Sequence, residues 1–293
     1  MIERLLAILA AAACLVSCAP RGPYELAFHP SAGRVLRYRL SSQQTIRQTL
    51  PGRTAAISQE SAAGYRFTVR RTFAEGGALI EVVYERIRLD SRSPTGALSF
   101  DSSDPDSGTP ALRGLKALVG QGLLLLVDRR GRIRDIQGLE ELLESARTAA
   151  AASHASAQAV AQAFSREALE SSLAGFFEFY PDRKVLPGDS WQTERSGGPG
   201  LALRLRHTWT LREVRRGRAL LDLSTAILSA APSEQGGLNG TQQGRLELEL
   251  ATGALISASI RQQIRGTILV KGLPVPMEIT GSAAIRAAGQ LPE

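Results

Sequence analysis

The stretch Leu201–Leu228, LALRLRHTWTLREVRRGRALLDLSTAIL, decides the fold class of this protein. From Leu203 to Leu211 every second residue is apolar or aromatic except His207, and arginine or threonine stands between them. This two-residue period is typical of a β-strand with one buried and one solvated face. Gly217 supplies a turn, and the apolar run after it predicts the second strand of a hairpin.

The same pattern recurs on both sides of this hairpin. Alternating or apolar runs predict further strands at 35–40, 65–71, 78–89, 123–128, 132–136, 245–250, 254–260 and 267–270. Short turns are expected at Gly76-Gly77, Arg130-Gly131, Asn239-Gly240, Gly253 and Lys271-Gly272. Strands joined by turns this short favour an antiparallel meander.

Two pairs of segments resemble each other. RTFAEGGALIEV from Arg71 aligns without gaps with REVRRGRALLDL from Arg212, and LVDRRGRI from Leu126 resembles LELATGAL from Leu248. These matches predict two related halves, although hairpin turns alone can also produce similarities of this length.

A different pattern separates the two sets of strands. Leu139, Leu142, Leu143 and Ala146 recur at helical spacing, and acidic residues follow Leu139 directly, near the positive end of the expected helix. A second amphipathic stretch runs from residue 160 to 180, and a shorter helical piece is expected within 110–120. The sequence therefore predicts an α+β, mostly β protein, a curved antiparallel half-barrel in two related halves with a central helical segment on its concave face.

The chain divides into three expected regions. Residues 1–17 form a signal peptide, 18–33 a Pro- and Gly-containing tether, and 34–290 a single β-rich domain. Within that domain, 34–136 is the first strand set, 137–181 the helical segment and 182–290 the second strand set.

The first segment, MIERLLAILAAAACLVSC, predicts a location. Its apolar run is shorter than the roughly 20 residues that span a bilayer, and it fits a secretory signal. Leu15 to Cys18 resembles the lipobox of bacterial lipoproteins, which implies cleavage between Ser17 and Cys18 and lipid attachment at Cys18. We therefore expect an envelope protein, on the periplasmic side of the outer membrane if the host has two membranes. A disulfide or metal pair is disfavoured because Cys14 lies inside the apolar signal, and an ordinary cleaved signal is the alternative.

The charge of the chain favours an anionic partner or a solvated surface. The formal net charge is +7, and only three of the 35 basic residues are lysines. Nucleic acid is not an expected partner of an exported, lipid-anchored protein. Anionic lipid head groups or cell-wall polymer remain as partners, and a solvated arginine-rich face is the simpler alternative.

Residues that could support catalysis are few. The sequence contains no Gly-x-Ser-x-Gly, phosphate-loop or zinc motif, and its histidines, His29, His154 and His207, are not spaced for one metal. We expect His207 to be a core or rim histidine. The acidic stretch DSSDPDSG from Asp101 could bind calcium but is more typical of an exposed turn. We predict no enzyme, no catalytic residue, no cofactor and no metal site. Four glutamines expected on the solvent face could contact sugars: Gln43, Gln44, Gln242 and Gln243.

A curled sheet has an apolar concave face that must be covered. The helix around 164–180 is the available cover, and a loose fit would leave a hollow suited to acyl chains. The residues expected to line such a hollow are Tyr65, Phe67, Phe164, Leu173, Phe176, Phe177 and Trp209. We therefore predict non-catalytic binding of a hydrophobic or amphiphilic molecule. A solid scaffold that binds an envelope partner through its arginine-rich outer face is the alternative, and an envelope hydrolase is a third.

The stretch YPDRKVLPGDSWQTE, residues 180–194, resembles a segment of bacterial exported and lipid-anchored proteins with no assigned function. The lipobox, VDRRGRI and LELATGAL are similar to the same family, so the resemblance covers most of the mature chain. Its architecture is similar to that of half-barrel lipoprotein carriers of the LolA/LolB kind, which implies a curved sheet that wraps a helix and holds acyl chains. Such a likeness does not establish function.

Overall fold

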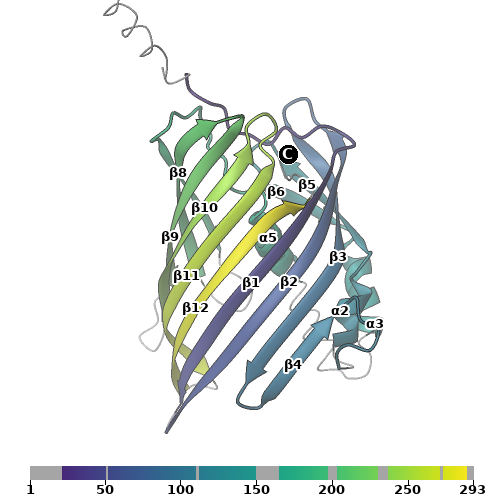
Figure 1. The fold of residues 1–293 in the computed structure, drawn as a ribbon, viewed down its shortest axis with the longest axis vertical. Helices are drawn as coiled ribbons and strands as arrows, with labels where there is room; N and C mark the ends of the chain where they lie inside the picture. The colour runs from purple at the N-terminus through teal and green to yellow at the C-terminus, as the bar shows by residue number, and fades with distance from the viewer. Residues whose placement is uncertain are drawn as a thin grey trace, which may run out of the picture.

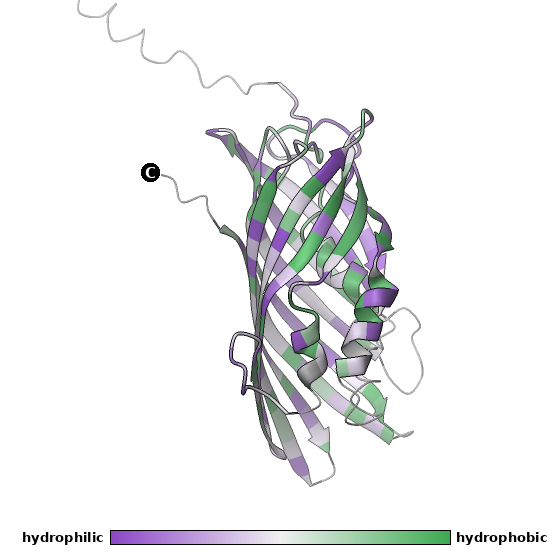
Figure 2. Ribbon diagram, turned by 90° about the vertical axis from the view of Figure 1, so that its right-hand side faces the viewer, coloured by the Kyte–Doolittle hydropathy of each residue, from purple (hydrophilic) through white to green (hydrophobic). Residues whose placement is uncertain are grey.

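The computed structural model describes residues 22–50, 52–109, 112–149, 165–196, 203–229, 237–270 and 273–288. These residues form one curved antiparallel sheet of twelve strands and three helices. This confirms the predicted mostly β fold. Figure 1 shows long, strongly tilted strands, and Figure 2 shows the helices on one side of the curved sheet.

The first half of the chain contributes six strands and two helices. In chain order these are β1 Val35–Leu50, β2 Arg53–Thr72, β3 Gly77–Ser93, β4 Gly96–Asp101, α2 Arg113–Ala117, β5 Gly122–Asp128, β6 Ile133–Gln137 and α3 Leu139–Ala149. On one side β3 pairs with β2, and on the other side it pairs with β5 along its first part and with β4 along its last part.

The second half contributes one helix and six strands. They are α5 Arg166–Ala174, β7 Ser190–Ser196, β8 Leu203–Arg215, β9 Arg218–Ser229, β10 Gly237–Glu249, β11 Leu255–Val270 and β12 Leu273–Ala288. The side chain of Ser165 caps α5 by accepting a hydrogen bond from the backbone N–H of Ala168 at 3.2 Å.

The sheet order is β6-β5-β3-β2-β1-β12-β11-β10-β9-β8-β7. Neighbours in this order are consecutive in the chain with two exceptions: β3 pairs with β5, because β4 lies off this path, and β1 pairs with β12, which joins the first and last strands. The repeated sequence segments fall at equivalent hairpins, β2–β3 with β8–β9 and β5–β6 with β10–β11. This arrangement agrees with two related halves.

The core lies between the concave face and α5 with the residues that follow it. Phe176 packs its ring 5.1 Å from that of Phe67 and 5.3 Å from that of Tyr65, both on β2. Phe177 stacks on Phe67 with ring centroids 5.7 Å apart. Because Leu173 of α5 is also completely buried, this end of the sheet is filled by protein side chains.

Two details of the sequence prediction are corrected. Within the stretch 18–33 that was predicted as a tether, Leu26 and Phe28 are buried in the core, so this part of the stretch belongs to the folded domain. The turn expected at Asn239-Gly240 is wrong, because both residues lie inside β10. A Cβ atom at Gly240 would lie 2.2 Å from a carbonyl oxygen of β11, so this glycine permits close strand approach. The turn predicted at residues 271–272 lies outside the described residues.

Candidate functional site

A cavity of about 260 Å³ lies on the concave face where the aromatic packing ends. Part of its wall comes from α5 and the turn after it, through Ala174, Gly175, Glu178 and Phe179. The remaining wall comes from β1 and β7–β12, and it contains both apolar side chains, such as Trp209 and Leu223, and polar ones, such as Gln242 and Gln262. Such a mixed lining is typical of a site that binds an amphiphilic molecule.

Strand register arranges the inward side chains of this region in three parallel rows. The tryptophan row is Trp191, Trp209, Leu223, Gly244, Ile260, Ala283, Ser42 and Ser61. The polar row is Thr193, His207, Thr225, Gln242, Gln262, Gly281, Gln44 and Gln59. The aliphatic row is Arg195, Leu205, Ile227, Gly240, Ile264, Ile279, Ile46 and Ile57. A band of amide, hydroxyl and imidazole groups thus crosses an otherwise apolar face.

Hydrogen bonds tie the polar row together in pairs. The side chain of Gln242 donates to that of Gln262 at 3.0 Å, and Gln44 donates to Gln59 in the same way. Because an amide carries two N–H donors and a carbonyl acceptor, each pair keeps groups free for a further partner. The three of these glutamines that line the cavity, Gln44, Gln242 and Gln262, can therefore bind a polar group inside it.

Glycines on the concave face leave room above the strands. Gly244 and Gly281 occupy positions in the tryptophan and polar rows, and a Cβ atom there would lie 2.6 Å and 2.8 Å from carbonyl oxygens of neighbouring strands. The absence of side chains at both positions keeps this part of the concave face open beside Ile260 and Gln262.

The cavity wall also contains two side chains of opposite charge. Arg195 donates through Nη1 to the backbone carbonyl of Ser171 at 3.3 Å, whereas its Nε is buried and has no partner among the described residues. Glu178 attracts it electrostatically, without a hydrogen bond between them. Burial lowers the pKa of Arg195 and raises the pKa of Glu178, so neither charge is fully compensated.

His207 is a buried member of the polar row. Its Nδ1 lies 2.8 Å from the hydroxyl oxygen of Thr225. Burial, aided by the charge of Arg195, lowers the pKa of His207 to about 4, so the imidazole is neutral at pH 7. The histidine predicted to lie in the core or at its rim is thus in the core and at the cavity wall.

The predicted ligand-lining residues fall into two groups. Trp209 lines the cavity, and its indole N–H donates to the hydroxyl of Thr193 at 3.0 Å. The others that the structure describes are buried away from the described cavity wall: Tyr65, Phe67, Leu173, Phe176 and Phe177. Phe164 lies outside the described residues, as do Ser17 and Cys18.

Sequence reasoning missed most of the polar row. Of the four glutamines predicted to face solvent, Gln43, Gln44 and Gln242 border the cavity. Gln43 and Gln243 are exposed, whereas Gln44 and Gln242 belong to the partly buried polar row. Gln262 and the charged pair of Glu178 and Arg195 were not anticipated. Alternation from Trp191 does place residue 195 on the buried face, and this signal could have identified it.

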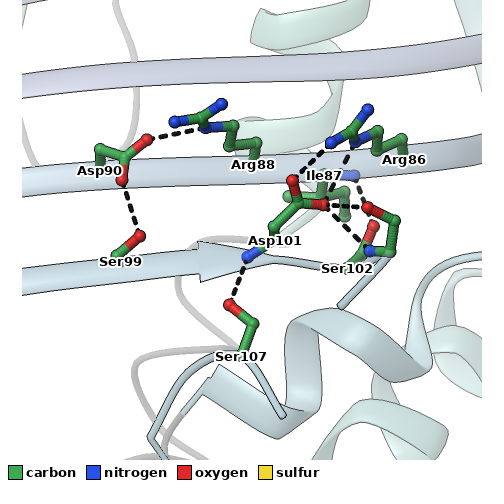
Figure 3. Close-up of polar contacts among 9 residues, drawn as sticks. Arg86, Ile87, Arg88, Asp90, Ser99, Asp101, Ser102 and Ser107 are labelled. Atoms are coloured by element: carbon green, nitrogen blue, oxygen red, sulfur yellow. Dashed lines mark hydrogen bonds and ion pairs between the residues drawn. The ribbon is translucent and has the colours of Figure 1, made fainter. Parts of the chain in front are cut away.

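The acidic stretch considered for calcium is used within the fold (Figure 3). Asp101, at the end of β4, accepts hydrogen bonds from Arg86 of β3 at 3.2 Å and from the backbone N–H of Ser103 at 3.0 Å. These bonds hold the pKa of Asp101 well below its usual range. Among the described residues, no group of three or more potential metal ligands is present.

The Gly-Asp-Ser-Trp segment fixes how the chain enters the second strand set. Gly188 adopts a positive φ of 97°, and the Asp189 carboxylate accepts a hydrogen bond from the backbone N–H of Leu186 at 2.9 Å. Trp191 is buried and donates to the carbonyl of Phe179 at 3.1 Å. This motif therefore connects β7 to the segment that covers the cavity.

Comparison with known proteins gives a family without an activity. A family model described as "Family of unknown function (DUF6263)" matches residues 75–255, which reach from the β2–β3 turn to the start of β11. No curated protein matches the chain. Over the described residues, no helix is long and apolar enough to cross a bilayer.

Proposed function

The chain belongs to the DUF6263 family of unknown function, and we propose that it is a lipid-anchored envelope protein that binds a hydrophobic or amphiphilic molecule without chemical conversion. The cavity beneath α5 is the observation that carries this proposal, because it combines apolar walls with a hydrogen-bonding row. Its volume of about 260 Å³ lies just below the range of roughly 300–1,000 Å³ that is typical of ligand pockets, so we propose a ligand with a single acyl chain.

The proposed anchor is the lipid-modified thiol of Cys18, which becomes the first residue after cleavage behind Ser17. Acyl chains on this residue would hold the domain at the membrane surface, since each buried methylene contributes about 0.8 kcal/mol. The domain starts close to this residue, because the backbone of Tyr24 already bonds to Val185. A ligand that moves between the cavity and the membrane holding the anchor would then travel only a short distance.

A bulky side chain at the cavity wall tests the binding role. Ala283→Phe places a ring at an inward position that lines the cavity, whereas Ala284→Phe places the same ring on the opposite face of β12. Gently purified proteins would be examined by native mass spectrometry and by mass spectrometry of solvent extracts. We expect a stoichiometric amphiphile with the natural protein and with Ala284→Phe, and its loss with Ala283→Phe. Absence of any amphiphile from all three proteins would contradict the proposal.

A second candidate function is partner binding through the convex face. A groove of about 680 Å³ on that face is lined by five arginines, Arg212, Arg215, Arg218, Arg245 and Arg286. Arg204 and Arg206 of β8 are exposed on the same side of the sheet. If this surface binds an envelope protein, reversal of Arg204 and Arg206 to glutamate should abolish capture of that partner from envelope extracts, and unchanged capture would count against the role.

A further inference from the structure

Arg195 is the one charged side chain in the aliphatic row. It lies on the edge strand β7 opposite Leu205, and the row continues with isoleucines on four of the next five strands. A guanidinium group beside aliphatic side chains is unfavourable unless hydrogen bonds and an opposite charge compensate it. The hydrogen-bond donors of Arg195 that the protein leaves without a partner therefore indicate which ligand group it could bind.

The protein itself compensates Arg195 only in part. The bond from Nη1 to the carbonyl of Ser171 places the guanidinium near the C-terminal end of α5, where a positive charge is favourable. Its buried Nε has no partner among the described residues. By contrast, the exposed Arg206 on the neighbouring strand forms an ion pair with Glu194 at 2.8 Å.

The surroundings of Arg195 favour a ligand with a single negative charge. Arginine binds carboxylates and phosphates through parallel N–H donors, and such charge-assisted bonds are stronger where water is excluded. Glu178 lines the same cavity and would repel additional negative charge. His207 is neutral near pH 7 and can offer a hydrogen bond but no positive charge.

We propose that Arg195 binds the carboxylate of a single-chain amphiphile whose apolar chain lies along the tryptophan row. This inference rests on the proposed binding function and names its ligand class. The glutamines of the polar row then donate to the remaining lone pairs of the carboxylate oxygens. The apolar chain lies against Leu223, Ile260 and Trp209.

The probes that test the inference are decanoate, decanol and decyl phosphate, which share one chain and differ in the head group. Binding to the full-length mature protein would be measured by titration calorimetry and by tryptophan fluorescence. We expect decanoate to bind at least about tenfold more tightly than decanol, since charge-assisted hydrogen bonds are stronger than those between neutral groups. Decyl phosphate, with its greater charge, should bind more weakly than decanoate.

Three variants test whether the cavity residues Arg195 and Glu178 determine the preference for decanoate over decanol. Arg195→Gln should reduce the preference for decanoate over decanol to within about threefold, and Arg195→Lys, which keeps the charge but lacks parallel donors, should give an intermediate value. Glu178→Gln should tighten decanoate binding and leave decanol unchanged, a result that a purely structural role of Arg195 would not produce. Arg206→Gln is the exposed control and should retain the natural preference.

The outcomes separate this inference from the proposed function. Equal affinity for decanoate and decanol, or an undiminished preference in a folded Arg195→Gln protein, would overturn the inference while binding itself stands. Tighter binding of decyl phosphate than of decanoate would overturn the assignment of a carboxylate. Failure of every probe to bind would overturn the proposed function and this inference with it.

Discussion

The buried His207 makes a specific prediction for the pH dependence of stability. Its pKa of about 4 in the folded protein lies below the ordinary value of 6.5, because burial disfavours the charged imidazole. Below pH 6.5 the unfolded chain therefore binds a proton that the folded chain does not bind. The contribution of this residue to the free energy of unfolding falls as the pH decreases from 6.5 to about 4, and changes little at lower pH.

The size of the effect follows from the pKa difference. Each pKa unit corresponds to about 1.4 kcal/mol, so His207 should account for a loss of about 3 kcal/mol between pH 7.5 and pH 4. His207→Asn removes the titrating group and keeps a polar side chain beside Thr225. We expect the free energy of unfolding of the natural protein to decrease by about 3 kcal/mol more than that of His207→Asn over this interval.

Urea unfolding followed by tryptophan fluorescence at several pH values measures this difference. His29→Asn, the same substitution at an exposed histidine, is the matched control. Parallel profiles for the natural protein and His207→Asn would refute the reasoning, since they would mean that the imidazole is protonated as readily in the folded chain as in water. An NMR titration of the imidazole would provide an independent reading of the same pKa.

Three further predictions concern the turns, the core and the anchor. Gly131→Ala should destabilise the protein more than Gly217→Ala in thermal melts, because both glycines have positive φ, 74° and 72°, but only at residue 131 would the new methyl group lie 1.9 Å from a carbonyl oxygen. Equal decreases in melting temperature for the two variants would contradict this reasoning. Tyr180→Phe should lower the free energy of unfolding by about 1–3 kcal/mol, because the carbonyl of Gly253 loses a buried hydrogen bond of 2.7 Å; an unchanged urea midpoint would show that the bond contributes little. Cys18→Ala should abolish lipid attachment and move the protein from the detergent phase to the aqueous phase, and unchanged partitioning and mass would exclude the anchor.

The fold was largely predictable because alternation and turn residues are local signals. The pattern around Leu203–Leu211 identifies a strand and its buried face without knowledge of its neighbours. Gly131 and Gly217 mark real hairpins, since their backbone conformation favours glycine. Gly240 misled the prediction because glycine also occurs where two strands approach closely, and composition alone does not distinguish these two uses.

The site was much less predictable because it depends on pairing between distant strands. Gln44 and Gln262 approach the same cavity from either side of β12, although more than two hundred residues separate them in the chain. The sequence places each glutamine beside another polar residue, which is also typical of a solvated strand. Only the register shows that one glutamine of each dipeptide points inward and that these side chains lie in one row.

The position of the polar row relative to α5 supports a binding role over a purely structural one. A sheet that only needed to hold its helix would gain most from aliphatic side chains, as the aliphatic row illustrates with isoleucine on five of its strands. Partly buried amides require hydrogen bonds, and those of the polar row satisfy each other only in pairs. The row lies where the packing of Phe176 and Phe177 gives way to a cavity. Arg195 lies beside it, and its Nε has no hydrogen-bond partner in the part of the chain that the structure describes. The glutamine pairs and the bond from Arg195 to α5 use only part of this hydrogen-bonding capacity. A ligand with one apolar chain and one polar end would supply partners for the rest and fill the cavity.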